Sequence, residues 1–263
     1  MSLQIIEWPD FLADSPAAEG AAITIGVFDG IHLGHRKLID RIVSRGPKPT
    51  VLTFKENPKK AVSPETYEGD LLSLKQKIAV FESLGLSRVI LIDFSEEFCK
   101  LKGSDFLDLL RSQGKMAFLA IGSNFRCGYR RDTDADFIRE VNERKGIPTE
   151  VLPPVRLSEG PVSSSRIRSA VISGDLKLAA ALMSRNFELD VSDISPHCSS
   201  GGALVYDLGA VQRIVPALGR YPVRMHPGDV KTWADTETGK VLLPITWTES
   251  PIERLEFIDY QSF

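Results

Sequence analysis

The 263-residue sequence has little cysteine, no long apolar run and no strong excess of charge of either sign. Its three cysteines, Cys99, Cys127 and Cys198, are far apart and odd in number. They therefore exclude a disulfide framework and a cysteine-based metal site, and they fit a reducing cytoplasm. No apolar run approaches the length of a membrane-spanning helix. A net charge of −3 argues against a general nucleic-acid binder or membrane-surface binder.

Targeting and repeat signals are also missing. The segment from Met1 to Trp8 has no basic stretch followed by a long apolar core, so no signal peptide is expected. The sequence contains neither an internal repeat nor a low-complexity tract. What is present is ordinary for a globular protein, with 43% hydrophobic and 25% charged residues, and the length suits one large domain plus a small one.

The first two thirds of the chain alternate short apolar runs with amphipathic segments. The apolar runs predict strands at 21–25, 49–54, 87–93, 116–122 and 149–152. The amphipathic segments predict helices at 36–43, 74–84, 104–110, 135–145, 163–172 and 176–183, with Ser104 as the N-cap of the third. This alternation predicts an α/β protein with a doubly wound parallel sheet and a ligand site beyond the carboxyl ends of the strands.

Beyond about Phe187 the pattern changes to short β-like runs separated by glycine, proline and serine. The runs fall at 204–206, 221–225, 230–233 and 241–246. They predict a small antiparallel sheet or barrel. We therefore expect two domains, one at 1–186 and a small β domain at 187–263.

The segment from Gly26 to His35 reads GVFDGIHLGH and lies between a predicted strand and a predicted helix. Three glycines let the backbone turn tightly and approach a ligand closely. The N-terminus of the following helix suits a phosphate because its N–H groups are unpaired and carry partial positive charge. Two of the four histidines, His32 and His35, are three residues apart, which places them on one face of the first turn.

A second segment, from Val162 to Arg168, combines three serines with two arginines at a predicted helix N-terminus. Such hydroxyl and N–H groups can hold an anion, and a cation four or five residues along can lean back over it. Taken alone, ordinary capping by Ser163 or Ser164 with surface arginines is the better interpretation.

These segments resemble a known family. G-x-F-D-G-x-H-x-G-H is similar to the adenylyltransferase module of prokaryotic FAD synthetases, within the H-x-G-H nucleotidyltransferase superfamily. The segment 162–168 resembles the family's S-S-T-x-I-R, with Ser165 in place of threonine. The segment 122–128 resembles G-x-[DN]-F-x-F-G, with Cys127 in place of an aromatic residue and Thr133 where a glycine is common. The segment 53–58 resembles T-F-x-P-H-P, with Glu56 and Asn57 in place of proline and histidine.

The resemblance implies transfer of AMP from ATP to FMN, giving FAD and pyrophosphate, with Mg²⁺ on the triphosphate. It implies catalytic roles for His32, His35, Ser164 and Arg168. ATP contacts are expected from Gly26, Phe28, Asp29, Gly30, His32, Gly34, His35, Gly122, Ser163, Ser164 and Arg168. Flavin contacts are expected from Asp29, Phe54, Asn57, Pro58, Asn124, Phe125 and Arg126.

Some assignments stay open. Asp29 either caps the turn, which is the favoured interpretation, or assists a metal or the acceptor. Arg126, Arg130 and Arg131 form either a solvated basic loop or part of the site. His197 and His226 lie outside any motif and are expected at the surface. The sequence names neither metal ligands nor an oligomeric state, and no nucleic-acid or membrane partner is expected.

The resemblance covers 21–187. Bifunctional relatives continue into a riboflavin kinase barrel with a glycine-rich element and a P-T-A-N motif, and neither occurs here. The tail faintly resembles later kinase strands at 214–223 and 252–259, so we interpret it as a shortened barrel without kinase activity. The segments 53–58 and 122–128, where flavin contacts are expected, depart from the family pattern and leave two alternatives. One is a related nucleotidyltransferase with another phosphorylated acceptor, and the other is a non-catalytic nucleotide- or flavin-binding protein.

Overall fold

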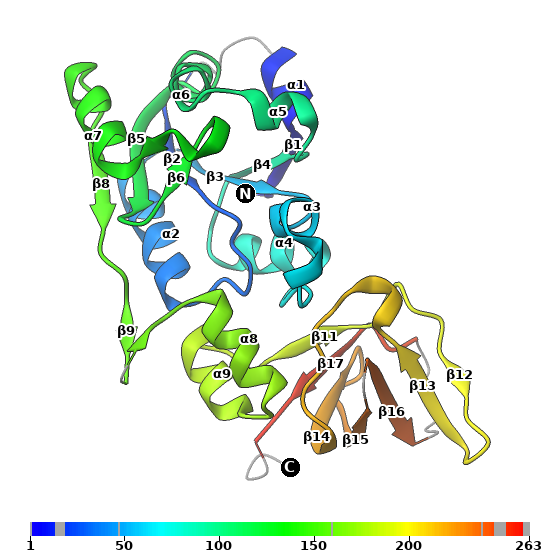
Figure 1. Cartoon of the computed structure of the whole chain (residues 1–263). Coiled ribbons are helices and arrows are strands. Elements are labelled where there is room, and N and C mark those ends of the chain that lie inside the picture. Colours follow the sequence, from blue (N-terminus) through cyan, green and yellow to red (C-terminus); the bar gives the residue numbers. More distant parts are fainter. Residues whose placement is uncertain are drawn as a thin grey trace. The chain divides into compact units, whose positions relative to one another are not determined.

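The computed structural model of the chain describes residues 2–13, 19–46, 48–158, 160–237, 239–244 and 251–259. The chain forms two compact units (Figure 1). Unit 1 comprises Met1–Glu65 and Lys77–Arg156, and unit 2 comprises Thr66–Gln76 and Leu157–Phe263. The expected domain boundary at residue 186 lies inside unit 2 and stays a prediction.

Unit 1 contains a six-stranded parallel sheet with the order β1-β4-β3-β2-β5-β8. The five predicted strands all form, and an unpredicted strand, β1, adds to one edge. The strands are β1 (Gln4–Glu7), β2 (Ala21–Ile25), β3 (Pro49–Phe54), β4 (Arg88–Ile92), β5 (Met116–Gly122) and β8 (Thr149–Leu152). The predicted doubly wound α/β fold is confirmed.

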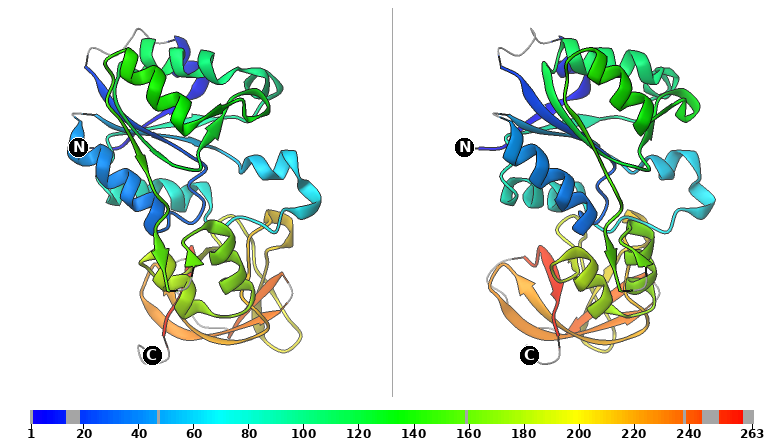
Figure 2. Two further views of the ribbon diagram at one scale, coloured as in Figure 1. Left: turned by 60° about the vertical axis from the view of Figure 1, so that its left-hand side comes forward. Right: turned by 90° about the vertical axis from the view of Figure 1, so that its left-hand side faces the viewer.

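Helices cover both faces of this sheet (Figure 2). Every residue of β2 and β4 is buried, as expected for strands covered on both sides. Apolar side chains of the strands pack with Trp8, Phe11 and Phe106 into the core. The helices are α1 (Trp8–Ala13), α2 (Leu33–Arg45), α3 (Pro58–Val62), α4 (Leu74–Ser83), α5 (Glu96–Lys100), α6 (Gly103–Ser112) and α7 (Ala135–Arg144).

The predicted N-cap at Ser104 is wrong. Helix α6 begins at Gly103, and Lys102 occupies the cap position without a side-chain capping bond. The backbone N–H of Gly103 instead donates to Oδ1 of Asp132 at 3.1 Å. A carboxylate twenty-nine residues further along the chain therefore accepts the first N–H of this helix, which a local serine pattern cannot reveal.

Unit 2 contains a seven-stranded antiparallel sheet with the order β11-β17-β14-β15-β16-β13-β12. Its strands are β11 (Glu188–Asp190), β12 (His197–Cys198), β13 (Ala203–Asp207), β14 (Gly219–His226), β15 (Val230–Glu237), β16 (Lys240–Pro244) and β17 (Arg254–Phe257). The four predicted runs correspond to β13–β16, although Ile245 and Thr246 lie outside the described residues. The antiparallel β region is confirmed.

Two helices of unit 2, α8 (Ser164–Ile172) and α9 (Leu176–Met183), match their predictions closely. The remaining elements are short: β6 (Arg126–Cys127), β7 (Thr133–Asp134), β9 (Arg156–Leu157), β10 (Gly160–Pro161) and single 3₁₀ turns at Pro64–Thr66, Tyr129–Arg131 and Gly209–Val211. No helix among the described residues has the length and apolar character needed to cross a bilayer.

Candidate active site

The carboxyl edge of the parallel sheet gathers the loops that the sequence singled out. Strand β2 lies between β3 and β5, so the chain leaves the middle of the sheet in two directions. This is the topological switch point, where α/β sheets bind their ligands. The loops after Ile25, Phe54 and Gly122 follow these three adjacent strands, and Ser123 N–H bonds to Leu152 O at the end of β8.

The turn that follows β2 has an unusual backbone. Gly30 has a φ of +78°, and two side-chain-bearing residues, Phe28 and Ile31, have φ values of +52° and +35°. Positive φ is rare for bulky residues and costs about 1–3 kcal/mol each. Such conformations concentrate at functional sites, where the surrounding contacts hold them in place.

His32 ends this turn and caps helix α2. Its Nδ1 accepts the backbone N–H of His35 at 3.2 Å. A neutral imidazole that accepts at Nδ1 carries its proton on Nε2, so His32 offers Nε2–H as a donor. The two imidazoles are stacked, with centroids 3.6 Å apart and planes inclined by 12°. The cap and the stacking together fix the direction of both rings.

Small and buried residues support the histidines. Phe28 is fully buried and packs edge-on against His35 at 4.9 Å and Phe81 at 5.6 Å between centroids. A Cβ on Gly34 would lie 3.2 Å from two atoms of the His32 ring, and one on Gly26 would lie 3.2 Å from Phe28. Phe28 thus contacts His35 directly, whereas its predicted contact with ATP stays a prediction. Asp29 is also buried, at 4% exposure.

The loop after β3 repeats the capping arrangement on a smaller scale. Asn57 accepts the N–H of Lys59 through Oδ1 at 3.1 Å, and Pro58 occupies the first turn of α3. Asn57 is buried, but helix α3 has five residues and none of them is buried. The ring of Phe54 packs against Phe94 and Phe98. The predicted flavin contacts of Phe54, Asn57 and Pro58 stay predictions.

The loop after β5 is fastened to helix α6. Strands β6 and β7 pair, and Asp132 accepts both the Gly103 N–H and the Thr133 hydroxyl. Burial, with a smaller contribution from the charge of Asp132, raises the pKa of Cys127 to about 12. The Cys127 thiol is therefore uncharged at neutral pH and fills space instead of acting as a nucleophile.

The polar side chains of this loop face outward. Asn124 and Arg126 are exposed, and Arg126 forms a long ion pair of 3.9 Å with Asp134. Phe125 packs partly against the core. A Cβ on Gly122 would lie 3.1 Å from Oδ1 of Asn124. The expected ligand contacts of Gly122, Asn124, Phe125 and Arg126 stay predictions.

In unit 2, the serine–arginine segment forms the N-terminus of α8. Ser163 caps the helix by accepting the Arg166 N–H at 3.2 Å, as its capping interpretation predicts. The Arg166 guanidinium donates to the carbonyls of Leu157 at 2.8 Å and Gly160 at 3.1 Å, so this arginine braces the preceding loop. Arg168 is 5% exposed, and its Nε donates to Gly69 O at 3.0 Å.

The predicted site residues therefore divide between the units. The glycine-rich turn and the two loops with expected flavin contacts, 53–58 and 122–128, belong to unit 1. Ser163, Ser164 and Arg168 belong to unit 2. Their joint role in one site stays a prediction.

Sequence reasoning missed Lys77. Its side chain is 5% exposed, and its Nζ donates to Val27 O at 3.2 Å and Phe54 O at 3.3 Å. A signal was present, because Leu74, Lys77 and Phe81 share one face of an amphipathic helix at spacings of three and four. A lysine on the apolar face of a helix is unusual enough to mark a buried polar contact.

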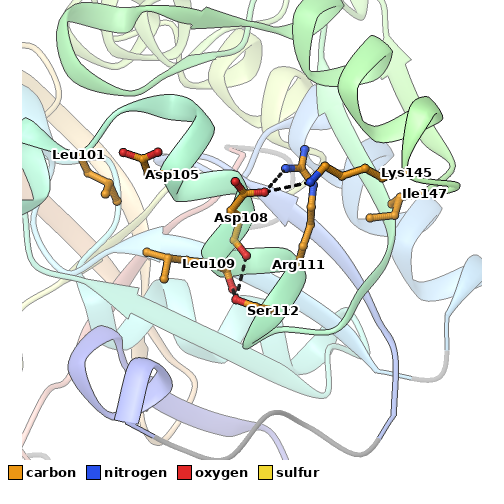
Figure 3. Close-up of a pocket in the computed structure, with 8 residues that line it drawn as sticks. All are labelled: Leu101, Asp105, Asp108, Leu109, Arg111, Ser112, Lys145 and Ile147. Atoms are coloured by element: carbon orange, nitrogen blue, oxygen red, sulfur yellow. Dashed lines mark hydrogen bonds and ion pairs between the residues drawn. The ribbon is translucent and has the colours of Figure 1, made fainter.

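A shallow hollow on unit 1 lies beside helix α6 (Figure 3). Three of its four charged groups pair with one another, since Asp108 bonds to Arg111 at 2.7 Å and to Lys145 at 3.3 Å. None of its lining residues belongs to the four sequence motifs.

Within the described ranges, no group of three or more histidine, cysteine, aspartate and glutamate side chains could hold a metal ion. All three cysteines are free thiols. Asp29 is the carboxylate of the glycine-rich turn itself, between Phe28 and Gly30.

Comparison with solved structures supports the fold. A crystal structure titled a macrolide-efflux protein from Streptococcus pneumoniae superposes with a TM-score of 0.79. The superposition covers 97% of this chain and 90% of the other, at 21% sequence identity. At that identity the likeness establishes a shared fold alone.

Curated relatives extend the comparison to sequence. The chain is 30% identical over 179 residues to a bifunctional riboflavin kinase/FMN adenylyltransferase of Pseudomonas fluorescens, covering 66% of this chain and 57% of that protein. It is 29% identical over 178 residues to the protein of the same name from Escherichia coli strain K12, covering 65% and 56% respectively. The chain thus matches little more than half the length of these relatives. The family model described as FAD synthetase matches residues 14–166, and the chain belongs to this family.

Proposed function

We propose that this chain is an FMN adenylyltransferase, which transfers AMP from ATP to FMN and releases pyrophosphate. The observation that carries the proposal is the arrangement at the switch point, where His32 caps α2 and stacks on His35 in a strained glycine-rich turn. The turn lies within residues 14–166, which match the FAD synthetase family model. A non-catalytic binding protein would not need this fixed pair of rings.

In the proposed reaction an oxygen of the FMN phosphate attacks the α-phosphorus of ATP. The bond from that phosphorus to the bridging oxygen breaks, and pyrophosphate leaves with the electron pair. Protein groups contribute mainly positioning and electrostatic stabilisation, since charge builds on the phosphoryl oxygens. Nε2–H of His32 and the N-terminus of α2 supply fixed donors for that charge. His35 then faces the phosphate and ribose, and Ser164 and Arg168 bind the remaining phosphates.

Mg²⁺ fits this proposal as a companion of the triphosphate. Mg²⁺ usually keeps several waters and binds through one or two carboxylates together with substrate phosphates. The described residues offer no cage of three or more ligands, and Asp29 is the carboxylate nearest in sequence to the histidines. The metal would neutralise charge on the leaving pyrophosphate.

The identity of the acceptor substrate has less support than that of ATP. Asn57 uses its Oδ1 to cap α3, and Cys127 replaces an aromatic residue with a small, half-buried thiol. These features favour testing a second candidate, a nucleotidyltransferase with another phosphorylated acceptor. We further propose that the chain has no riboflavin kinase activity and works in the cytoplasm, consistent with three free thiols.

The test is an incubation of the purified chain with ATP, MgCl₂ and FMN, with products separated by chromatography. FAD and pyrophosphate are expected in equal amounts. ATP with a methylene group between the α- and β-phosphorus is the matched control, because it binds as ATP does but cannot release pyrophosphate. Riboflavin in place of FMN should give no FMN.

Consumption of phosphopantetheine, nicotinate mononucleotide or a polyol phosphate, without FAD from FMN, would replace the acceptor in the proposal. Thermal stabilisation by ATP without turnover of any acceptor would establish the binding protein instead.

A further inference from the structure

Lys77 is a buried lysine that contacts the backbone of two loops of the proposed active site. Its Nζ bonds to the carbonyl oxygens of Val27 and Phe54, at 3.2 and 3.3 Å. Burying an ammonium group is costly unless hydrogen bonds replace its hydration. A leucine or methionine would pack at this position without that cost. The reason for a lysine is given by the two carbonyl oxygens that its ammonium group bonds to.

The first hydrogen-bond acceptor, Val27 O, belongs to the glycine-rich turn. Val27 O accepts a second hydrogen bond from Oγ1 of Thr53 at 3.0 Å. Because a trans peptide is planar, fixing this carbonyl also fixes the Phe28 N–H on the opposite side of the plane. Phe28 and Ile31 then adopt positive φ values that their side chains do not favour. Lys77 and Thr53 are thus two of the contacts that hold this strained backbone.

The second hydrogen-bond acceptor, Phe54 O, fixes the start of the loop at residues 55–58. This loop is called the acceptor loop, because its residues are expected to contact FMN. Phe54 is the last residue of β3, and the following Lys55 N–H bonds to Ile92 O at 3.0 Å on the neighbouring strand. Both sides of the Phe54–Lys55 peptide are therefore fixed. Asn57 and Pro58 begin α3 only three and four residues after Phe54.

We propose that Lys77 is a positioning residue that holds the glycine-rich turn and the acceptor loop in register for AMP transfer. The inference rests on the proposed function. Lys77 acts through the backbone at Val27 and Phe54 and leaves substrate contact to other groups. Misplacement of reacting groups by about 1 Å costs on the order of 100-fold in rate, so loss of Lys77 should lower kcat more than it raises KM.

The main test is Lys77→Met, which keeps the length and apolar contacts of the side chain and removes the ammonium group. We expect kcat to fall about 100-fold, with KM for ATP and FMN raised less than about tenfold. Lys77→Arg retains charged donors and should recover at least tenfold of that loss. Lys75→Met is the matched control, because Lys75 lies on the same helix with a 63% exposed side chain that pairs with Glu253.

A double-mutant cycle with Thr53→Val separates positioning from a general loss of stability. Thr53 and Lys77 act on the same carbonyl, so their effects on kcat should be strongly non-additive. A purely structural lysine would instead change the melting temperature and leave kcat of the folded protein unchanged. If Lys77→Met does not fold, Thr53→Val carries the test, because it removes the other hydrogen bond to Val27 O, and a normal kcat in this variant would overturn the proposal.

The outcomes distinguish the two proposals. Absence of FAD from the wild-type chain would overturn the proposed function, and the role of Lys77 with it. An active wild type beside a folded Lys77→Met with kcat within twofold of normal would overturn the role of Lys77 alone.

Discussion

The glycine-rich turn and the acceptor loop use the same local arrangement with different support. Each follows a parallel strand, and each starts a helix with a side-chain N-cap, His32 for α2 and Asn57 for α3. Helix α2 has thirteen residues and buries Leu38, Ile39 and Ile42, whereas α3 has five residues and buries none. The strong support of α2 fixes the ring of its cap residue, whereas α3 has no such anchor.

This difference suggests a division of labour. The turn before α2 is built to hold charge in one place, which a transition state requires. Helix α3, which follows the loop, buries none of its residues, so we expect its free energy of local opening to be low. Variants on the two sides should therefore affect different kinetic parameters.

The largest expected effect is that of His32→Asn. Asparagine is a strong N-cap, so the helix start is retained, but the Nε2–H donor is lost. Removing one donor to a developing oxyanion costs about 100- to 1,000-fold in kcat, and ATP affinity should change less than about threefold. Steady-state kinetics and ATP titration measure the two quantities. His197→Asn, at an exposed position in unit 2, is the control, and equal rates in both variants would remove His32 from the mechanism.

Asn57→Ala tests the other side of the comparison. Loss of the cap to Lys59 N–H should loosen α3, which has no buried residue to hold it. We expect KM for FMN to rise about three- to tenfold while kcat and the KM for ATP stay nearly constant. Asn57→Asp keeps a capping oxygen and should remain close to wild type. A fall in kcat without a change in KM would contradict the division of labour.

Gly34→Ala should separate stability from activity. Alanine is favoured over glycine in a helix by about 1 kcal/mol, so the melting temperature should hold or rise. The new methyl group would lie 3.2 Å from Nδ1 and Cε1 of His32 and should displace the ring by a few tenths of an ångström. We expect kcat to fall about fivefold, because catalysis depends on the direction of Nε2–H. A stabilised variant with normal kcat would show that the ring tolerates this displacement.

The sequence predicted the parallel sheet well because its strands are continuous apolar runs between chain breakers. Strands β2 to β5 and β8 of unit 1 were identified within about one residue. Strand β1 was missed because Gln4–Glu7 is short and half polar, and β11 because it has only three residues. Their pairing comes from distant partners, Arg88–Leu91 for β1, and such partners leave no local pattern.

The candidate site was predictable where a motif carries the chemistry and unpredictable where packing does. GVFDGIHLGH predicted a turn between a strand and a helix with both histidines in the first turn, and the structure has His32 at the N-cap of α2 and His35 in its first turn. The same motif could not reveal that Phe28 packs against His35, or that Lys77, fifty residues away, bonds to Val27 O. Likewise, Arg166 and Arg168 look equivalent in sequence, yet one braces a loop and the other is buried against Gly69 O.

The smallest expected effect concerns the far end of α2, where Arg41 bonds to Glu150 of β8 at 2.6 and 2.7 Å. The hydrogen bond from Arg41, together with its charge and that of Arg45, lowers the pKa of Glu150 below its ordinary value despite partial burial. A depressed pKa contributes stability that is present above the unfolded value, about pH 4.3, and is lost as the pH falls through the lower folded value.

Glu150→Gln should therefore lower the melting temperature by about 1–2 °C at pH 7, and this difference should vanish in acid below the folded pKa. Activity should not change, because the apolar face at Leu38, Ile39 and Ile42 holds α2 in place. Glu96→Gln is the control, since its pair with Lys100 is 89% exposed on the glutamate side and should contribute nothing measurable. A loss of kcat in Glu150→Gln would mean that the ion pair, and not the buried face of α2, orients His32.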